Sequence, residues 1–185
     1  EPAGSPQHPY RWRAALARLR ASRGDLDGAI AMLDEAEPRY TSDMFPKMRT
    51  VQAMRARVWI AQGRLDEATA WARDLGISAN DPISYLGIFD LLTLARVLLA
   101  QGAGGRSDER LQSGMQLLDR LRAAADAGGW TGSLIEALVL EALGHQELSN
   151  LPAARASLER ALSLAQPGGY VRVFVDEGEP MRRLL

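Results

Sequence analysis

Three arginines recur at equal spacing along this chain. Arg18, Arg57 and Arg96 stand 39 residues apart. Guanidinium groups bind carboxylates and phosphates through paired hydrogen bonds, and they stack on planar rings. A column of such groups could therefore hold an anionic or planar ligand. The alternative is that each arginine pairs with an acidic residue of a neighbouring helix, such as Glu136 or Glu141, and only orients the structure.

Large aromatic residues form a second set of binding candidates: Trp59, Tyr85, Phe89 and Trp130. Tryptophan and tyrosine in a groove suit sugars, drug-like molecules and peptides. Tyr85 and Trp130 are expected at the starts of helices and hence exposed. For Trp59 and Phe89 the alternative is packing in the core.

Catalytic and metal-binding chemistry finds little support. The chain has no cysteine, and its only histidines are His8 and His145, neither with a second ligand three or four residues away. Adjacent acids such as Asp34 and Glu35 point apart on a helix, so they do not form an acid/base pair. The glycine-rich segment 102–107 lacks the Gly-Lys-Ser/Thr of a phosphate-binding loop. We therefore predict no catalytic residues, no metal and no cofactor.

An internal repeat indicates which elements position these residues. Gly24-Asp25-Leu26-x-x-Ala29 recurs as Gly63-Arg64-Leu65-x-x-Ala68, and Gly102 lies a further 39 residues along. Asn150 is expected to take the same left-handed turn in a fourth unit. Helical spacing of apolar residues predicts helices over residues 9–23, 26–37, 43–62, 65–75, 82–101, 109–127, 131–149 and 151–165.

Small residues and helix-end signals support the paired helices. Ala29, Ala68, Gly114 and Ala154 occupy the position where the second helix of each pair would cross the first closely. Asp81-Pro82 predicts a helix start, and Gly76 and Gly128-Gly129 predict helix ends. The third unit is longer because of a polar insertion at 103–109.

Composition restricts the class of protein. Apolar residues make up 46% of the 185 residues and charged residues 24%, as in globular domains. A formal net charge of −1 provides no basic field for nucleic acid. The sequence shows no signal peptide and no apolar run of membrane-spanning length. We expect a cytoplasmic protein, and we expect this chain to be a fragment of a longer one.

The turn signature Gly-x-Leu-x-x-Ala resembles tetratricopeptide repeats, although the period exceeds the usual length of about 34 residues. Two stretches, 94–102 (LARVLLAQG) and 168–181 (GGYVRVFVDEGEPM), resemble large LuxR-type transcription regulators related to the maltose-operon activator. In that family an ATPase module precedes the repeats and a helix-turn-helix DNA-binding domain follows them. The repeat region receives the inducer and contributes to self-association. Neither flanking module is present in this sequence.

The segment 171–175 is ambiguous. Its alternating β-branched residues are typical of a short strand, whereas the family resemblance implies a helix that opens a further layer. We favour the helix.

The sequence thus predicts an all-α, tetratricopeptide-like α-solenoid of about four helix-turn-helix pairs in a right-handed superhelix. Residues 1–8 form a leader, 9–166 form the repeats (9–37, 43–76, 82–127 and 131–166), and 167–185 form a terminal segment.

The resemblance implies an effector-binding and protein-interaction domain of a bacterial transcription activator. Its partners would be a small-molecule inducer or a protein segment, with no direct nucleic-acid or membrane binding. The alternatives are a free-standing scaffold that binds a peptide and, less well supported, an enzyme. The predicted concave-face site comprises Arg18, Arg57, Arg96, Tyr85, Phe89, Trp130 and Glu141.

Overall fold

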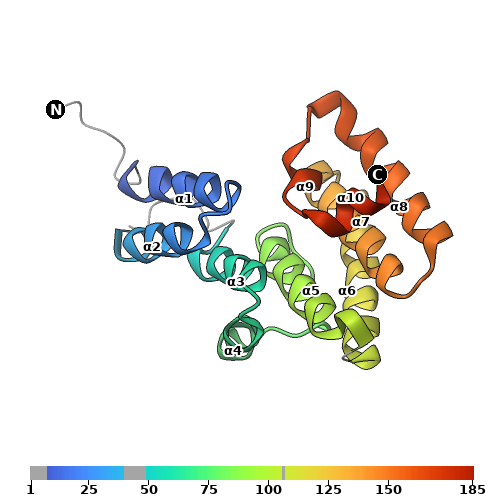
Figure 1. Cartoon of the computed structure of the whole chain (residues 1–185), viewed down its shortest axis with the longest axis horizontal. Coiled ribbons are helices and arrows are strands. Elements are labelled where there is room, and N and C mark those ends of the chain that lie inside the picture. Colours follow the sequence, from blue (N-terminus) through green and yellow to red (C-terminus); the bar gives the residue numbers. More distant parts are fainter. Residues whose placement is uncertain (1–7, 40–48, 106) are drawn as a thin grey trace. The chain divides into compact units, whose positions relative to one another are not determined.

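The computed structural model describes residues 8–39, 49–105 and 107–185, and within these ranges the chain is helical with no β-strand (Figure 1). Contacts divide the chain into two compact units, residues 1–75 and 76–185. The first seven residues of the predicted leader lie outside the described residues. The predicted all-α class is confirmed for the described part of the chain.

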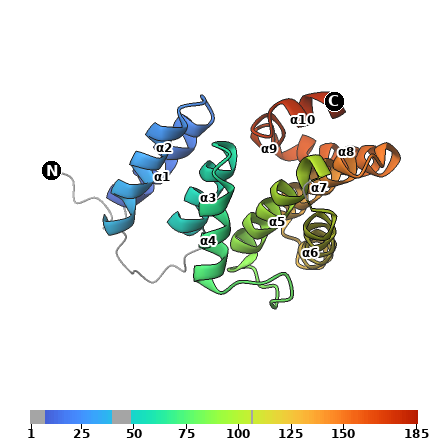
Figure 2. The ribbon, with the colours of Figure 1, turned by 60° about the horizontal axis from the view of Figure 1, so that its bottom comes forward.

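Unit 1 contains two helix pairs. Helices α1 (His8–Ala21) and α2 (Leu26–Ala36) form the first, and α3 (Val51–Ala61) and α4 (Leu65–Leu75) form the second. Helix α2 contacts both α1 and α3, so the two pairs are joined through it (Figure 2). A short 3-10 turn, Glu37–Arg39, follows α2.

Unit 2 contains α5 (Ile88–Gly102), α6 (Asp108–Ala127), α7 (Thr131–Glu147) and α8 (Leu151–Ala165). Each helix packs on the next, and α5 also contacts α7. Two short helices follow, α9 (Arg172–Val175) against α7 and α10 (Glu179–Leu184) against α8. The helical interpretation of segment 171–175 is therefore correct: residues 172–175 form a short helix, and Phe174 on it is buried.

The turns within pairs follow the repeat in unit 1 only. Gly24 and Gly63 have φ of 81° and 74°, a backbone conformation that favours glycine. In the fourth pair the prediction for Asn150 is wrong, because Ser149 takes the positive φ of 56° and the Asn150 side chain accepts a hydrogen bond from the backbone N–H of Ala153. Asn150 thus serves as the N-cap.

Gly102 also differs from the prediction. It ends α5 without a positive φ, and a Cβ at this position would lie 2.5 Å from the Cβ of Leu111. Gly104 and Gly105 make the left-handed turn instead, with φ of 66° and 73°. The glycine at position 102 therefore permits the close approach of α5 and α6.

One predicted helix start is wrong, and another lies outside the described residues. Helix α5 begins at Ile88 and not at 82, and Asp81 accepts hydrogen bonds from the backbone N–H and hydroxyl of Ser78 instead of capping a helix at Pro82. Those hydrogen bonds hold a turn and lower the pKa of Asp81. Helix α3 begins at Val51, where Thr50 caps it, and residues 43–48 of the predicted helix lie outside the described residues.

The predicted close crossings are confirmed. Ala29, Ala68 and Ala154 are fully buried, and a Cβ at Gly114 would lie 3.2 Å from the Cβ of Leu98. By length and composition the stretch Ile88–Gly105 could cross a membrane, but 61% of it is buried inside the protein, as expected of a core helix.

Candidate functional site

The arginine column divides between the two units. Arg18 lies exposed on α1 and Arg57 lies partly buried on α3, both in unit 1, whereas Arg96 lies on α5 in unit 2. Their predicted role in ligand binding stays a prediction for Arg18 and Arg57.

Arg96 is held by two carboxylates from other elements. Its Nη2 lies 2.6 Å from Oε1 of Glu177 and 3.1 Å from Oε1 of Glu136, and its Nη1 and Nε also donate hydrogen bonds, to Glu177 and Glu136 respectively. The three side chains are only 18%, 14% and 12% exposed for Arg96, Glu136 and Glu177. Burial disfavours the guanidinium charge, but the carboxylates outweigh this and raise the pKa of Arg96.

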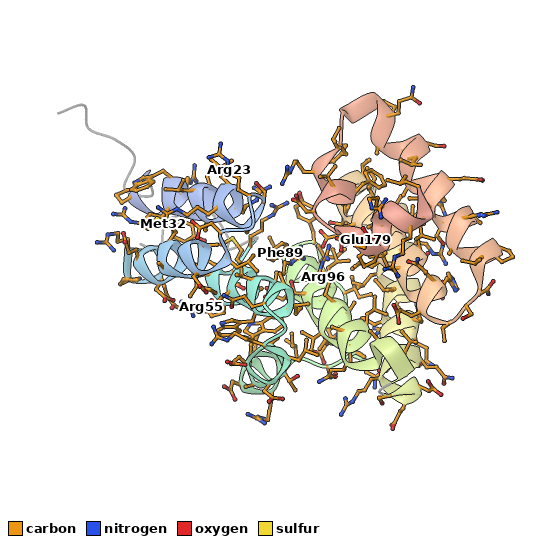
Figure 3. The ribbon with its side chains drawn as sticks, in the orientation of Figure 1. Arg23, Met32, Arg55, Phe89, Arg96 and Glu179 are labelled. Carbon is orange, nitrogen blue, oxygen red and sulfur yellow. The ribbon has the colours of Figure 1, made fainter. Side chains whose placement is uncertain are left out.

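The cluster joins α5, which carries Arg96 (Figure 3), to α7 and to the segment between α9 and α10. It also links the two stretches that carry the family resemblance, because Arg96 belongs to the first and Glu177 to the second. The contacts of Arg96 therefore support the bracing role that the sequence left open.

Glu141 has a comparable role inside unit 2. It is 7% exposed on α7, and its Oε1 accepts a hydrogen bond from Nε of Arg122 on α6 at 2.9 Å. Its second oxygen lies 3.4 Å from the hydroxyl of Ser157 on α8. Burial raises the pKa of Glu141, while Arg122 opposes this effect. A carboxylate shared by three helices orients those helices.

Two predicted site residues do come together. The rings of Tyr85 and Trp130 lie 5.4 Å apart between centroids and are tilted by 55°. Tyr85 is 47% exposed, and Trp130 is half-buried at the N-cap of α7. Leu86, beside Tyr85, is 48% exposed. The pair thus presents aromatic surface to solvent at the start of α7.

A third exposed aromatic residue lies near the start of α7, and the sequence reasoning missed it. Tyr170 is 43% exposed, and its Cε1 lies 3.6 Å from the position that a Cβ on Gly132 would take. Tyr170 and Trp130 sit in equivalent turns, since each follows two glycines and each backbone N–H donates to the carbonyl five residues earlier. The repeated Gly-Gly-aromatic pattern, 40 residues apart, could have revealed it.

We call Tyr85, Trp130 and Tyr170 the aromatic edge. In each Gly-Gly turn the aromatic ring folds back over the first glycine. A Cβ at Gly128 would lie 2.5 Å from the Trp130 ring, and a Cβ at Gly168 would lie 2.5 Å from the Tyr170 ring. The second glycine of each turn takes a positive φ, 66° at Gly129 and 64° at Gly169. Aromatic faces fixed in this way can stack on sugar rings, planar molecules or peptide side chains.

The remaining aromatic candidates lie elsewhere. Phe89 is buried on α5, in agreement with the core alternative. Trp59 on α3 is half-buried, with the guanidinium carbons of Arg55 and Arg64 at 5.9 and 5.7 Å from its ring centroid. These cation–π contacts fix the ring within unit 1.

Among the described residues, no group of three or more histidine, cysteine, aspartate or glutamate side chains could hold a metal ion.

Comparison with known proteins gives one family. The family model described as the MalT-like TPR region matches residues 1–185. The HTH-type transcriptional regulator MalT of Serratia proteamaculans is 27% identical over 97% of this chain and 19% of its own length. The protein of the same name from Yersinia enterocolitica is 26% identical over the same shares. The chain thus spans about a fifth of the length of these relatives. No solved structure matches it.

Proposed function

This chain belongs to the family of MalT-like TPR regions, and we propose that it is the effector-binding and protein-interaction repeat domain of a bacterial transcription activator. The match over the whole chain carries this proposal. Two relatives named as HTH-type transcriptional regulators support it. As part of such a regulator the domain would work in the cytoplasm, and it would bind a partner or ligand without catalysing a reaction.

We further propose that the helix pairs follow a right-handed superhelix. The observed pairing of α1 with α2, α3 with α4, α5 with α6 and α7 with α8 supports this arrangement. So does the 39-residue repeat in the sequence.

The aromatic edge is the surface that we assign to effector binding. Its rings come from three separate loops, before α5, α7 and α9. Tyr85 and Tyr170 are exposed to solvent, and Trp130 is half-buried. Aromatic rings at the starts of helices can offer a ligand apolar contact, and because the rings are already held in place, binding costs little side-chain entropy. Arg57 remains a second, independent candidate from the sequence.

A thermal-shift screen of sugars and other metabolites against this chain tests the proposal. A ligand at 100 times its Kd stabilises the folded state by about 2.7 kcal/mol. We expect Tyr85→Ala and Trp130→Ala to lose this ligand shift while the ligand-free melting temperature stays close to that of the original chain.

Trp12→Ala is a matched control, since Trp12 is 41% exposed but lies in unit 1. It should keep the ligand shift. If the edge variants keep the shift and Arg57→Ala loses it, the arginine site is the correct one. A library without any hit, combined with saturable binding of a protein segment, would favour the scaffold alternative over an effector-binding domain.

A further inference from the structure

Helix α1 carries an apolar stripe on its exposed side. Trp12 and Leu19 are 41% and 45% exposed, and Ala15 between them is also exposed. The spacing of three and four residues places all three on one face of the helix. Exposed apolar side chains that form a continuous face mark contact surfaces more often than single ones do.

The repeat identifies what this face corresponds to in the next pair. Moving 39 residues along the chain takes Trp12, Ala15 and Leu19 to Val51, Met54 and Val58 on α3. In α3 those residues are only 5%, 7% and 7% exposed. The same face is therefore buried in the second pair and exposed in the first.

A second set of residues indicates which helix packs on the buried Val51, Met54 and Val58 face of α3. Ala17 is buried on α1, which packs on its own partner α2. It corresponds to Ala56, and Ala14 corresponds to Ala53. By this equivalence, α3 uses Ala53 and Ala56 against its own partner α4. The other buried face of α3 is then the one that packs on α2, the second helix of the preceding pair. The stripe on α1 is the equivalent stacking face.

Charge defines the kind of helix that fits. At the junction of α2 and α3, Gln52 donates to Glu37 at 2.5 Å and Gln62 donates to Asp27 at 2.7 Å. Arg55 adds ion pairs with Asp34 and Glu37, both at 2.8 Å. The second helix of the preceding pair is thus the acidic side of this junction.

In α1 both glutamine positions are occupied by arginine. Gln52 corresponds to Arg13 and Gln62 corresponds to Arg23. Residues 8–23 hold five arginines and no acidic residue. Figure 3 shows the Arg23 side chain extending outward from the end of α1. Arg13 already pairs with Glu35 of α2 at 3.1 Å. Arg23 is therefore the cation that an acidic helix resembling α2 would meet where α3 offers the neutral amide of Gln62.

We propose that the face of α1 formed by Trp12, Ala15 and Leu19 docks an acidic amphipathic helix, the second helix of a further helix pair outside these 185 residues. The relatives are about five times longer than this chain, so such a pair has room in a protein of their size. The α2 helix of a second copy is a poor occupant, because its stacking face is already covered by α3. This docking is independent of the proposed effector site.

A register-matched duplication tests the proposal. A second copy of residues 9–47, placed directly before Pro9, keeps the 39-residue step and puts a copy of α2 ahead of α1. The chain has no cysteine, so Leu19→Cys in the original segment provides a single thiol. We expect this thiol to react with a maleimide at least about tenfold more slowly in the duplicated chain, because docking buries it.

Ala31→Cys, on the exposed side of α2, is the control and should react at the same rate with and without the duplication. The acidic character is tested in the added copy. Asp27→Arg there should restore rapid labelling of the thiol at position 19, and Arg23→Asp in the original segment should slow it again. Circular dichroism would confirm that each compared chain is folded.

Equal labelling of the thiol at position 19 with and without the added copy would overturn the proposal. Slow labelling of the thiol at position 19 that persists after Asp27→Arg in the added copy would show that the docked helix need not be acidic. If this thiol is protected in the unduplicated chain as protein concentration rises, the occupant is a second copy and the proposal is also wrong.

Discussion

Removal of Arg96 should destabilise unit 2 strongly. Arg96→Ala would leave Glu136 and Glu177 facing each other without their shared cation, although their side chains are only 14% and 12% exposed. Removing one partner of a buried ion pair typically costs about 3–5 kcal/mol. Since 18% of the Arg96 side chain reaches solvent, we expect a value near the lower end, about 3 kcal/mol.

The assay is thermal unfolding followed by circular dichroism. For a chain of this size each 1 kcal/mol lowers the Tm by about 2–4 °C, so the expected decrease is about 6–12 °C. Arg182→Ala is the control, because its ion pair with Glu179 is solvent-exposed, and we expect no measurable change.

Removal of all three charges should destabilise unit 2 less than removal of Arg96 alone. Arg96→Met combined with Glu136→Gln and Glu177→Gln leaves no carboxylate without a cation, so it should recover most of the lost stability. Unchanged melting of Arg96→Ala would show that solvent screens the cluster and would refute the reasoning. Melting of the triple variant below that of Arg96→Ala would show that the ion pairs contribute more than the avoidance of unpaired charge.

Three further predictions concern packing, pH and nucleic acid. Ala68→Arg or Ala154→Arg should destabilise the fold severely, because both residues are fully buried and overpacking alone costs about 1–3 kcal/mol. The control Ala31→Arg, at an exposed position, should leave the melting temperature unchanged. An unchanged melting temperature of the buried variants would contradict the assigned helix faces. The raised pKa of Glu141 means that the folded state binds its proton more tightly, so this group's contribution to stability declines as pH rises from the ordinary glutamate pKa towards the raised value. Glu141→Gln should remove that decline in urea titrations across this pH range, and an identical pH profile would count against it. With a net charge of −1 the chain should bind duplex DNA negligibly, and submicromolar binding at physiological salt in a fluorescence anisotropy titration would disagree.

Local sequence signals determined the helices whose ends are set by local chemistry. The predicted ranges 65–75 and 151–165 agree with α4 and α8, because a turn residue with positive φ precedes each helix and apolar spacing continues through it. Close crossings at Ala29, Ala68 and Ala154 were also predictable, since only small side chains permit them.

The start of α5 was decided by tertiary contacts. The Asp81-Pro82 pair is a helix-start signal on its own, but Arg120 of α6 donates hydrogen bonds to the carbonyls of Ala79 and Asp81. These bonds satisfy the backbone of a non-helical loop and make it stable. A residue 39 positions away thus outweighs the local preference.

The candidate site shows the same division. Residue type marked Arg96, Tyr85 and Trp130 as candidates, and Glu136 was one of two acidic residues named as partners in the bracing alternative. Glu177, which lies 81 residues from Arg96, and the contact of Tyr85 with Trp130 depend on how α5, α7 and the C-terminal segment pack together. Sequence periodicity specifies one helix face at a time, whereas the meeting of side chains from distant loops is fixed only when the helices have packed.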